Sequence, residues 1–231
     1  MASYKAPTVS INQLSEYLTA GPSRRKSIIK ESRETKPFIV KTYNQASKAI
    51  SRYLTNYENE PHLLSSEIDR LYGELKDTHP EWEKQNIRLC VEALERFQLD
   101  SERLNLGKRS IRPANVGPNS LLVEGVKINI SPEGIVFEDV DGQNQPRAGL
   151  LKCHFSKTKK LTSKRANYIG AILHWYSEEH LSNVGQPDYR ASMIVDVQND
   201  MTIRIAPKGQ KRSREDIADA CSEIADRWGT V

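Results

Sequence analysis

Residues 120–155 read SLLVEGVKINISPEGIVFEDVDGQNQPRAGLLKCHF, and this stretch decides the fold. Alternate positions from Leu122 to Ile130 are mostly apolar, which is typical of a half-buried strand. Turn residues follow, first around Pro132 and Gly134 and then over 141–144, and each group precedes a further apolar run. The stretch therefore predicts three successive strands, over 122–130, 135–137 and 148–155.

The residues on either side of this stretch extend the pattern. An apolar face with helical spacing runs over 85–99, before the strands, and a second helix capped by Thr162 or Ser163 follows them. Residues 192–197 and 201–205 predict a hairpin. A last helix carries apolar residues on one face, with Ser213 and Asp216 as a variant of the capping box. The predicted order is helix, three strands, helix, strand pair, helix.

The first hundred residues lack this strand pattern. They show helical apolar spacing interrupted by Pro-containing turns, with Ser10 as a cap for the first helix. We therefore expect an α+β fold, with a helical N-terminal region followed by an αβββαβ-type mixed sheet core and a C-terminal helix. The expected divisions are a mostly helical region over 1–102, a Gly- and Pro-bearing connector over 103–119, and an α/β domain over 120–231 on which the helix 85–99 packs.

Composition excludes several classes of protein. Of the 231 residues, 37% are hydrophobic and 28% are charged, which is typical of a folded domain. No apolar run approaches the roughly 20 residues needed to span a bilayer, and the N-terminal MASYKAPTVS has no apolar core of a secretory signal. Cys90, Cys153 and Cys221 are too far apart for a disulfide framework or a CxxC metal site. We expect a cytoplasmic protein.

The net charge of +4 conceals strongly segregated blocks. Between Ser23 and Arg52 there are nine basic residues and two acids, whereas between Glu58 and Glu102 there are twelve acids and five bases. The segment from Arg147 to Arg165 has seven bases and no acid. Acid-free basic segments attract phosphates, so we expect contact with DNA or RNA. An alternative is that the basic block near the N-terminus binds the acidic helices of its own chain or of a neighbour.

The predicted order and two short motifs resemble the PD-(D/E)XK nuclease-like fold of restriction endonucleases and RecB-type nuclease domains. Pro132-Glu133 precedes the second strand, where that family places Pro-Asp, and Leu150-Leu151-Lys152 lies on the third strand, where it places (D/E)-x-K. The resemblance covers about 120 residues. It implies a Mg²⁺ site in which two carboxylates hold the metal and a lysine assists the activated water.

The sequence departs from that family at the second acid. Leu150 stands at the acid position and cannot bind a hard cation, while Glu133 replaces the family's aspartate. A replacement carboxylate could come from Glu92 or Glu95 on the preceding helix, or from an acid after the second strand. We therefore expect a degenerate metal site. If the protein is active, the catalytic residues are Glu133, Lys152 and Glu92, with Glu133 binding Mg²⁺.

The leading hypothesis is a nucleic-acid-binding protein with a catalytically degenerate nuclease-like domain, compatible with a role in bacterial phage defence or in a mobile element. The residues expected to contact phosphates are basic side chains after the third strand, followed by a group near the N-terminus: Lys157, Lys159, Lys160, Lys164, Arg165, Arg24, Arg25 and Lys26. The first alternative is an active Mg²⁺-dependent endonuclease. The second is a protein-interaction or scaffold subunit whose acidic and basic surfaces pair between chains.

Overall fold

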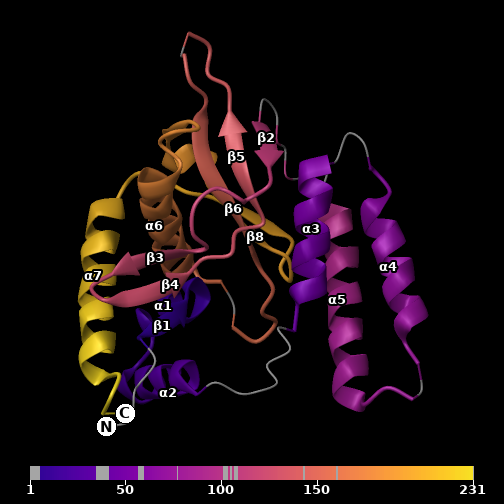
Figure 1. Cartoon of the computed structure of the whole chain (residues 1–231), viewed down its shortest axis with the longest axis horizontal. Helices are drawn as coiled ribbons and strands as arrows, with labels where there is room; N and C mark the ends of the chain where they lie inside the picture. Colours follow the sequence, from indigo (N-terminus) through magenta and orange to yellow (C-terminus); the bar gives the residue numbers. More distant parts are fainter. Residues whose placement is uncertain are drawn as a thin grey trace.

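The computed structural model describes residues 6–34, 42–56, 60–76, 78–100, 104, 106, 109–142, 144–159 and 161–230, with backbone only at 99 and 100. The chain has an α+β fold with a C-terminal helix (Figure 1). The helices are α1 Ile11–Tyr17, α2 Pro22–Arg33, α3 Asn44–Asn56, α4 Leu63–Glu74, α5 Glu81–Asp100, α6 Ser163–His180 and α7 Gln210–Arg227, with a 3₁₀ turn η2 at Tyr189–Ala191. The strands are β1 Thr8–Ser10, β2 Arg109–Arg112, β3 Ser120–Val123, β4 Val126–Asn129, β5 Gly134–Glu138, β6 Arg147–His154, β7 Gln186–Pro187, β8 Met193–Asp196 and β9 Met201–Arg204.

The larger sheet contains the predicted second and third strands and the predicted C-terminal strand pair, but not the predicted first strand. Its strands lie in the order β2-β5-β6-β8-β9, with β7 paired to β6. The strands β2, β5 and β6 form an antiparallel meander, and β8 runs parallel to β6 after the crossover through α6. The helix α5 precedes β2, so α5, α6 and the strands β2, β5, β6 and β8 follow the order αβββαβ once the inserted hairpin β3–β4 and the short β7 and η2 are left out. The predicted hairpin is confirmed as β8 and β9.

The prediction of a single strand over 122–130 is wrong. Glu124 and Gly125 take positive φ angles of 46° and 73° and turn the chain, so this segment forms the hairpin β3–β4 in a separate sheet with β1. Two left-handed residues are the geometry of a tight hairpin turn. The same face of the hairpin is buried on both strands, but the buried positions shift from odd numbers in β3 to even numbers in β4, so Leu122 is 70% exposed. The first strand of the meander is instead β2, inside the predicted connector.

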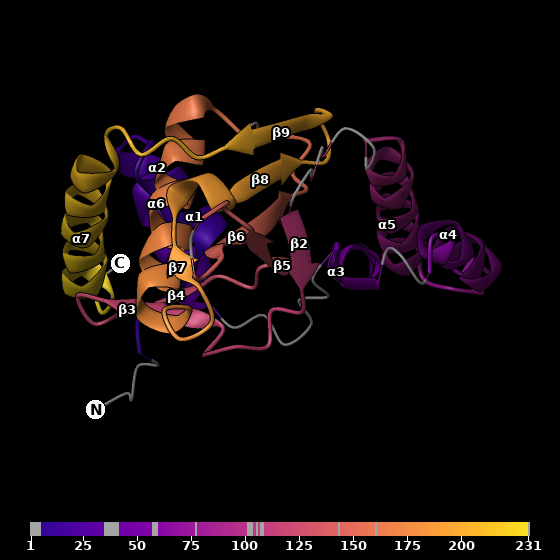
Figure 2. The same cartoon turned by 90° about the horizontal axis from the view of Figure 1, so that it is seen from above.

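Two hydrophobic cores cover the two faces of the larger sheet. One contains α1, α2, α6, α7 and the smaller sheet, together with Leu150 of β6. The other contains α3, α4 and α5, together with Leu151 and Cys153 of β6. Figures 1 and 2 show α3–α5 on one side of the sheet and α6 and α7 on the other. The first two helices therefore share their core with the C-terminal half of the chain, not with α3–α5.

The strand β6 is covered on both faces because it lies between these cores. Its residues are buried from Ala148 to His154, and this run includes the polar Lys152 and His154. Burying a charged side chain is costly unless it is paired and hydrogen-bonded. The partners of Lys152 and His154 therefore determine what this strand contributes to a site.

Helix termini confirm two of the three predicted caps. Ser10 forms a capping box with Gln13 at α1, and the Thr162 side chain accepts a hydrogen bond from the Arg165 backbone at α6. The predicted cap at Ser213 and Asp216 is wrong, because α7 begins earlier, at Gln210, after Gly209 with φ 84°. In the described ranges, no helix is both long enough and apolar enough to cross a membrane.

Candidate functional site

Glu133 and Lys152 form a buried ion pair between neighbouring strands. Glu133 directly precedes β5, and the antiparallel register of β5 and β6 places it opposite Lys152. The Lys152 ammonium lies 3.1 Å from one carboxylate oxygen and 3.2 Å from the other, and also donates to the Ser131 carbonyl oxygen at 2.7 Å. Glu133 is 1% exposed. The structure thus brings together two of the three residues that the nuclease alternative requires.

The carboxylate of Glu133 already has a full set of donors. Its Oε1 accepts from the Ser47 hydroxyl at 2.8 Å as well as from Lys152, and its Oε2 accepts from the Cys153 backbone N–H at 2.6 Å. Leu150, at the family's second acid position, is fully buried in the core beside α6. In the part of the chain that the structure describes, no three His, Cys, Asp or Glu side chains gather closely enough to hold a metal ion. These residues do not fit a Mg²⁺ site.

Glu92, the predicted replacement acid, pairs with basic residues other than Lys152. It lies on α5 with its side chain 35% exposed and forms ion pairs with Lys157 and Arg96. The hydrogen bond from Lys157 holds the pKa of Glu92 below its ordinary value. None of its contacts in the described ranges joins it to Glu133 or Lys152. Glu92 instead links α5 to the basic loop that follows β6.

A cleft of about 480 Å³ lies at the carboxyl end of β6. The loop after β6 forms one wall, α1 a second, and Tyr43 before α3 with Leu89 of α5 a third. It is lined by Asn12, Gln13, Glu16, Tyr43, Leu89, His154, Phe155, Ser156, Lys157, Thr158, Lys159 and Arg165. Three of the predicted phosphate-binding residues, Lys157, Lys159 and Arg165, therefore lie in one cleft.

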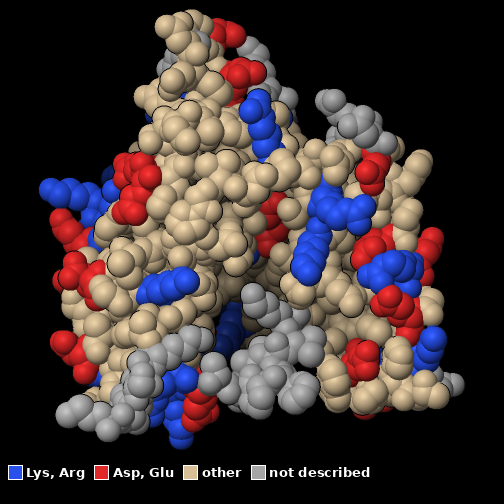
Figure 3. Space-filling view, viewed as in Figure 1, with Lys and Arg blue, Asp and Glu red and all other residues tan. Residues whose placement is uncertain are grey.

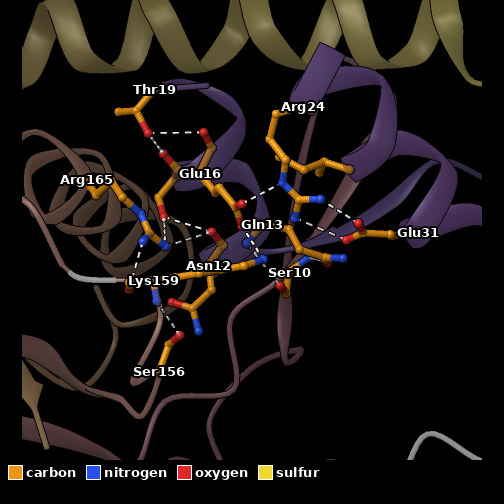
Figure 4. A network of polar contacts seen from close by, with 12 residues as sticks. Ser10, Asn12, Gln13, Glu16, Thr19, Arg24, Glu31, Ser156, Lys159 and Arg165 are labelled. Atoms are coloured by element: carbon orange, nitrogen blue, oxygen red, sulfur yellow. Dashed lines mark hydrogen bonds and ion pairs between the residues drawn. The ribbon is translucent and has the colours of Figure 1, made fainter. Parts of the chain in front are cut away.

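Glu16 is the acid at the centre of the polar network beside this cleft (Figure 4). Its carboxylate accepts from Arg24 Nε at 2.7 Å and from Lys159 Nζ at 2.8 Å. Burial opposes the ionisation of Glu16, but the hydrogen bonds from the two cations outweigh it and hold its pKa below the ordinary value. The network joins α1, α2 and the loop after β6, which the sequence places far apart.

Arg165 has a structural position at the start of α6. It is 6% exposed, and its guanidinium donates to the backbone oxygen of Lys159 at 3.1 Å. A second nitrogen reaches the Asn12 carbonyl oxygen on α1 at 3.4 Å. Arg165 thus fixes the loop after β6 against α1, so that the cleft has a defined wall (Figure 4).

The remaining predicted phosphate contacts lie outside this cleft. Arg25 pairs with Glu223 of α7 at 3.1 Å and lies over the Tyr17 ring, so it joins α2 to α7. Lys164 is exposed, with its ammonium 6.0 Å from the Tyr168 ring centroid, and Lys26 is exposed on α2. Among the residues that the structure describes, neither Lys26 nor Lys164 forms an ion pair. Lys160 lies outside the described residues.

His154, the last residue of β6, lines the cleft. Its Nε2 is 2.9 Å from the Lys159 backbone oxygen, and β8 places the buried Asp196 beside it in register. Burial lowers the pKa of His154, with the Lys159 carbonyl and Asp196 opposing the shift. Cys153 points to the other face and belongs to the other core. His154 and Cys153 therefore do not form a dyad, as the alternation along a strand predicts.

Sequence reasoning missed one feature of the cleft. Tyr43 and Phe155 stack with their ring centroids 5.2 Å apart and their planes at 13°. The sequence places Tyr43 among tyrosines with helical spacing and Phe155 at the end of a strand, 112 positions later. No local pattern relates the two positions. Two local signals were present: Phe155 directly precedes the basic run that contains Lys157 and Lys159, and Tyr43 is one of several tyrosines in or beside the basic N-terminal half, where interleaved aromatic side chains can stack bases.

Acidic and basic side chains are mixed over the surface shown in Figure 3. On α4, Arg70 pairs with Glu67 and Glu74 of the same helix, and on α5, Lys84 and Arg88 both pair with Glu81. In the described ranges, the acids of α4 and α5 therefore pair largely within these helices. The pairing of Arg24 and Arg25 with these helices, considered as an alternative, is not observed, because the two arginines bind Glu16, Glu31 and Glu223.

Comparisons with known proteins assign no family. No protein-family model matches the chain, and no curated protein matches it significantly. The residues of the cleft and of the buried pair are therefore the basis for assigning a function.

Proposed function

We propose that this protein binds nucleic acid in the cleft at the carboxyl end of β6, and that its core is a nuclease-like fold without a working metal site. The order α5, β2, β5, β6, α6, β8 supports the second part of this proposal, although the hairpin β3–β4 is inserted between β2 and β5. The positions of Glu133 before β5 and of Lys152 on β6 match those of the nuclease motif. The departure is Leu150, which is apolar and buried.

The observation that carries the proposal is the basic wall of the cleft. Lys157 and Lys159 lie two residues apart in the loop after β6, with side chains 40% and 46% exposed. Each forms an ion pair, with Glu92 and Glu16 respectively. The exposed pair of Lys157 with Glu92 contributes only about 0–1 kcal/mol. Glu16 is only 16% exposed, but it keeps Arg24 as a partner if Lys159 leaves it, so both ammonium groups can exchange a carboxylate for a phosphate.

Binding fits the geometry better than cleavage does. A metal-dependent nuclease needs carboxylate oxygens that are open to a cation and to a water molecule. Both oxygens of Glu133 are buried and accept hydrogen bonds from Ser47, Lys152 and the Cys153 backbone. The Glu133–Lys152 pair is therefore a structural contact between β5 and β6, in which each charge needs the other because both are buried.

A salt titration tests the proposal. Fluorescence anisotropy would measure the affinity for a labelled oligonucleotide between about 50 and 200 mM salt, a range over which phosphate contacts weaken binding strongly. Wild-type protein should bind with a marked salt dependence. The Lys157→Ala/Lys159→Ala variant should lower the slope of log K against log salt by roughly 1.4 on a single strand, since each lost contact contributes about 0.7.

The matched control is Lys127→Ala/Lys211→Ala, which removes two exposed lysines on β4 and α7, outside the cleft. This control should bind like wild type. Absence of binding, binding that does not depend on salt, or an equal loss in the control would contradict the proposal. Incubation with Mg²⁺ or Mn²⁺ should leave the oligonucleotide intact, and cleavage abolished by Lys152→Ala and by Glu133→Ala would instead establish the nuclease.

A scaffold role is the second candidate, and one observation favours it. Tyr72 on α4 is 51% exposed and Trp82 on α5 is 56% exposed, beside the acidic residues of these helices. Large exposed aromatic side chains are typical of protein interfaces. Analytical ultracentrifugation at low and high salt tests for pairing between copies, which should weaken as salt rises. A monomer at both salt concentrations would exclude this role for self-association.

A further inference from the structure

Tyr43 and Phe155 present an aromatic surface inside the proposed nucleic-acid cleft. Tyr43 directly precedes α3 and Phe155 directly follows β6, and their rings stack at 5.2 Å with an interplanar angle of 13°. Both residues line the cleft and both are only half-buried. Their positions at the ends of two packed elements hold the rings in place, so the surface exists before any ligand arrives.

A second aromatic pair shows what a purely structural contact looks like in this protein. Tyr53 and Phe97 pack edge to face, with centroids 6.4 Å apart, and are 7% and 1% exposed. That pair lies inside the core between α3 and α5. Tyr43 and Phe155 lie at the margin of the same core, where part of each ring is open to the cleft.

The aromatic surface adjoins the groups that would bind phosphate. Phe155 is two residues before Lys157 and four before Lys159, and all three line the cleft. Ser156 and Thr158 contribute hydroxyl groups to the same wall. Proteins that bind single strands combine a basic track for the backbone with aromatic rings on which bases stack. The wall after β6 holds both groups on one short segment.

We infer that the cleft takes single-stranded nucleic acid, with a base stacked against the Phe155–Tyr43 pair and the adjoining phosphates on Lys157 and Lys159. The inference rests on the proposed function and adds a class of ligand to it. Bases in a duplex are stacked on one another and cannot reach a ring inside a cleft, whereas an unpaired base can be splayed out onto one. The same contact tolerates any sequence, because every base has a π-face.

The experiment compares ligands of equal length, of which the two single strands also carry the same backbone charge. Fluorescence anisotropy would measure the binding of the full-length protein to an oligothymidylate, to the same strand with its bases removed, and to the corresponding duplex, all at one salt concentration. Loss of base stacking by alanine substitution weakens binding by roughly 5- to 150-fold per base. Wild type should therefore bind the oligothymidylate at least about fivefold more tightly than the abasic strand.

Two substitutions at Phe155 distinguish a loss of base stacking from a structural change in the cleft. Phe155→Leu keeps an apolar side chain and should remove the preference for bases while leaving the affinity for the abasic strand unchanged. Phe155→Trp keeps an aromatic face and should retain the preference. The variant Lys157→Ala/Lys159→Ala should instead weaken the binding of both strands by a similar factor.

The outcomes distinguish this inference from the proposed function. If no ligand binds, the proposed function fails, and the inference fails with it. If wild type binds the base-bearing and abasic strands equally, or prefers the duplex, the cleft binds phosphates without stacking and only the inference is overturned. The wild-type comparison decides this even if Phe155→Leu does not fold. If Phe155→Leu folds but weakens the binding of both strands equally, its effect is structural and the inference is wrong.

Discussion

The replacement Glu133→Gln tests whether the buried pair stabilises the sheet. The glutamine has nearly the same shape as the glutamate but carries no charge, so the Lys152 ammonium, with its side chain 9% exposed, would lose its only counterion in the described ranges. Removing one partner of a buried ion pair costs about 3–5 kcal/mol. Because Lys152 keeps its hydrogen bond to the Ser131 carbonyl, we expect a loss near 3 kcal/mol.

Urea unfolding followed by circular dichroism measures this loss as a lower midpoint. The control is Glu92→Gln, which removes an ion-paired acid that is 35% exposed and should cost under about 1 kcal/mol. The double variant Glu133→Gln/Lys152→Met removes both charges and should lose less than the sum of the two single variants, because residues in contact are coupled. If Glu133→Gln and Glu92→Gln had the same small effect, the pair would not support the sheet and the reasoning would be refuted.

Three further predictions concern the cleft and β6. Glu16→Gln removes the carboxylate that competes with phosphate for Lys159 and should raise oligonucleotide affinity severalfold in the anisotropy assay. The control Glu31→Gln should not raise it. An unchanged or lower affinity for Glu16→Gln would contradict this competition. Burial lowers the pKa of His154 from 6.5, so the unfolded chain binds more protons below that pH, and the free energy of unfolding should fall as the pH drops from about 7 towards 5.5. In urea unfolding, His154→Gln should lose less stability over this pH range. An equal pH dependence in wild type and variant would refute this. Gly149→Ala should lose roughly 1–3 kcal/mol, because a Cβ would lie 2.5 Å from the Ser192 backbone nitrogen, and an unchanged unfolding midpoint would show that β6 has room there.

The sequence predicts the elements of the core better than their pairing. The strand over 148–155, the helix capped by Thr162 and the hairpin near the C-terminus follow from local periodicity and capping, which depend on neighbouring residues. The strand over 122–130 fails because Leu122 continues the alternation across a turn at which the chain reverses. Glu124 is an uncommon residue at a positive φ, so the Glu-Gly pair gives only a weak turn signal.

The strand β2 is the converse case, because the structure forms a strand where the local sequence predicts none. Its sequence, Arg109–Arg112, has a single apolar residue, Ile111, and therefore lacks a detectable period. The strand forms because β5 supplies hydrogen-bonding partners along its whole length and Ile111 packs on the core of α3–α5. Such a strand is specified by its neighbours in space, which the local sequence does not contain.

The same limit applies to the site. The prediction of Glu133 and Lys152 as neighbours depends on a strand motif, and the structure brings the two together. The prediction that Lys157 and Lys159 contact phosphates depends on an acid-free basic run after a strand, and the structure places both residues in one cleft. The role of Glu16 in pairing with Lys159, and the contact of Tyr43 with Phe155, join residues more than a hundred positions apart. Only the fold creates these contacts.

The most direct test of the central claim is to locate the nucleic acid on the protein. Mass spectrometry would measure the acylation of each lysine with and without a saturating single-stranded oligonucleotide. We predict strong protection of Lys157 and Lys159, with Lys127 and Lys211 reacting as in the free protein. Protection confined to lysines outside the cleft, or none under conditions of saturated binding, would contradict the claim that this cleft binds nucleic acid.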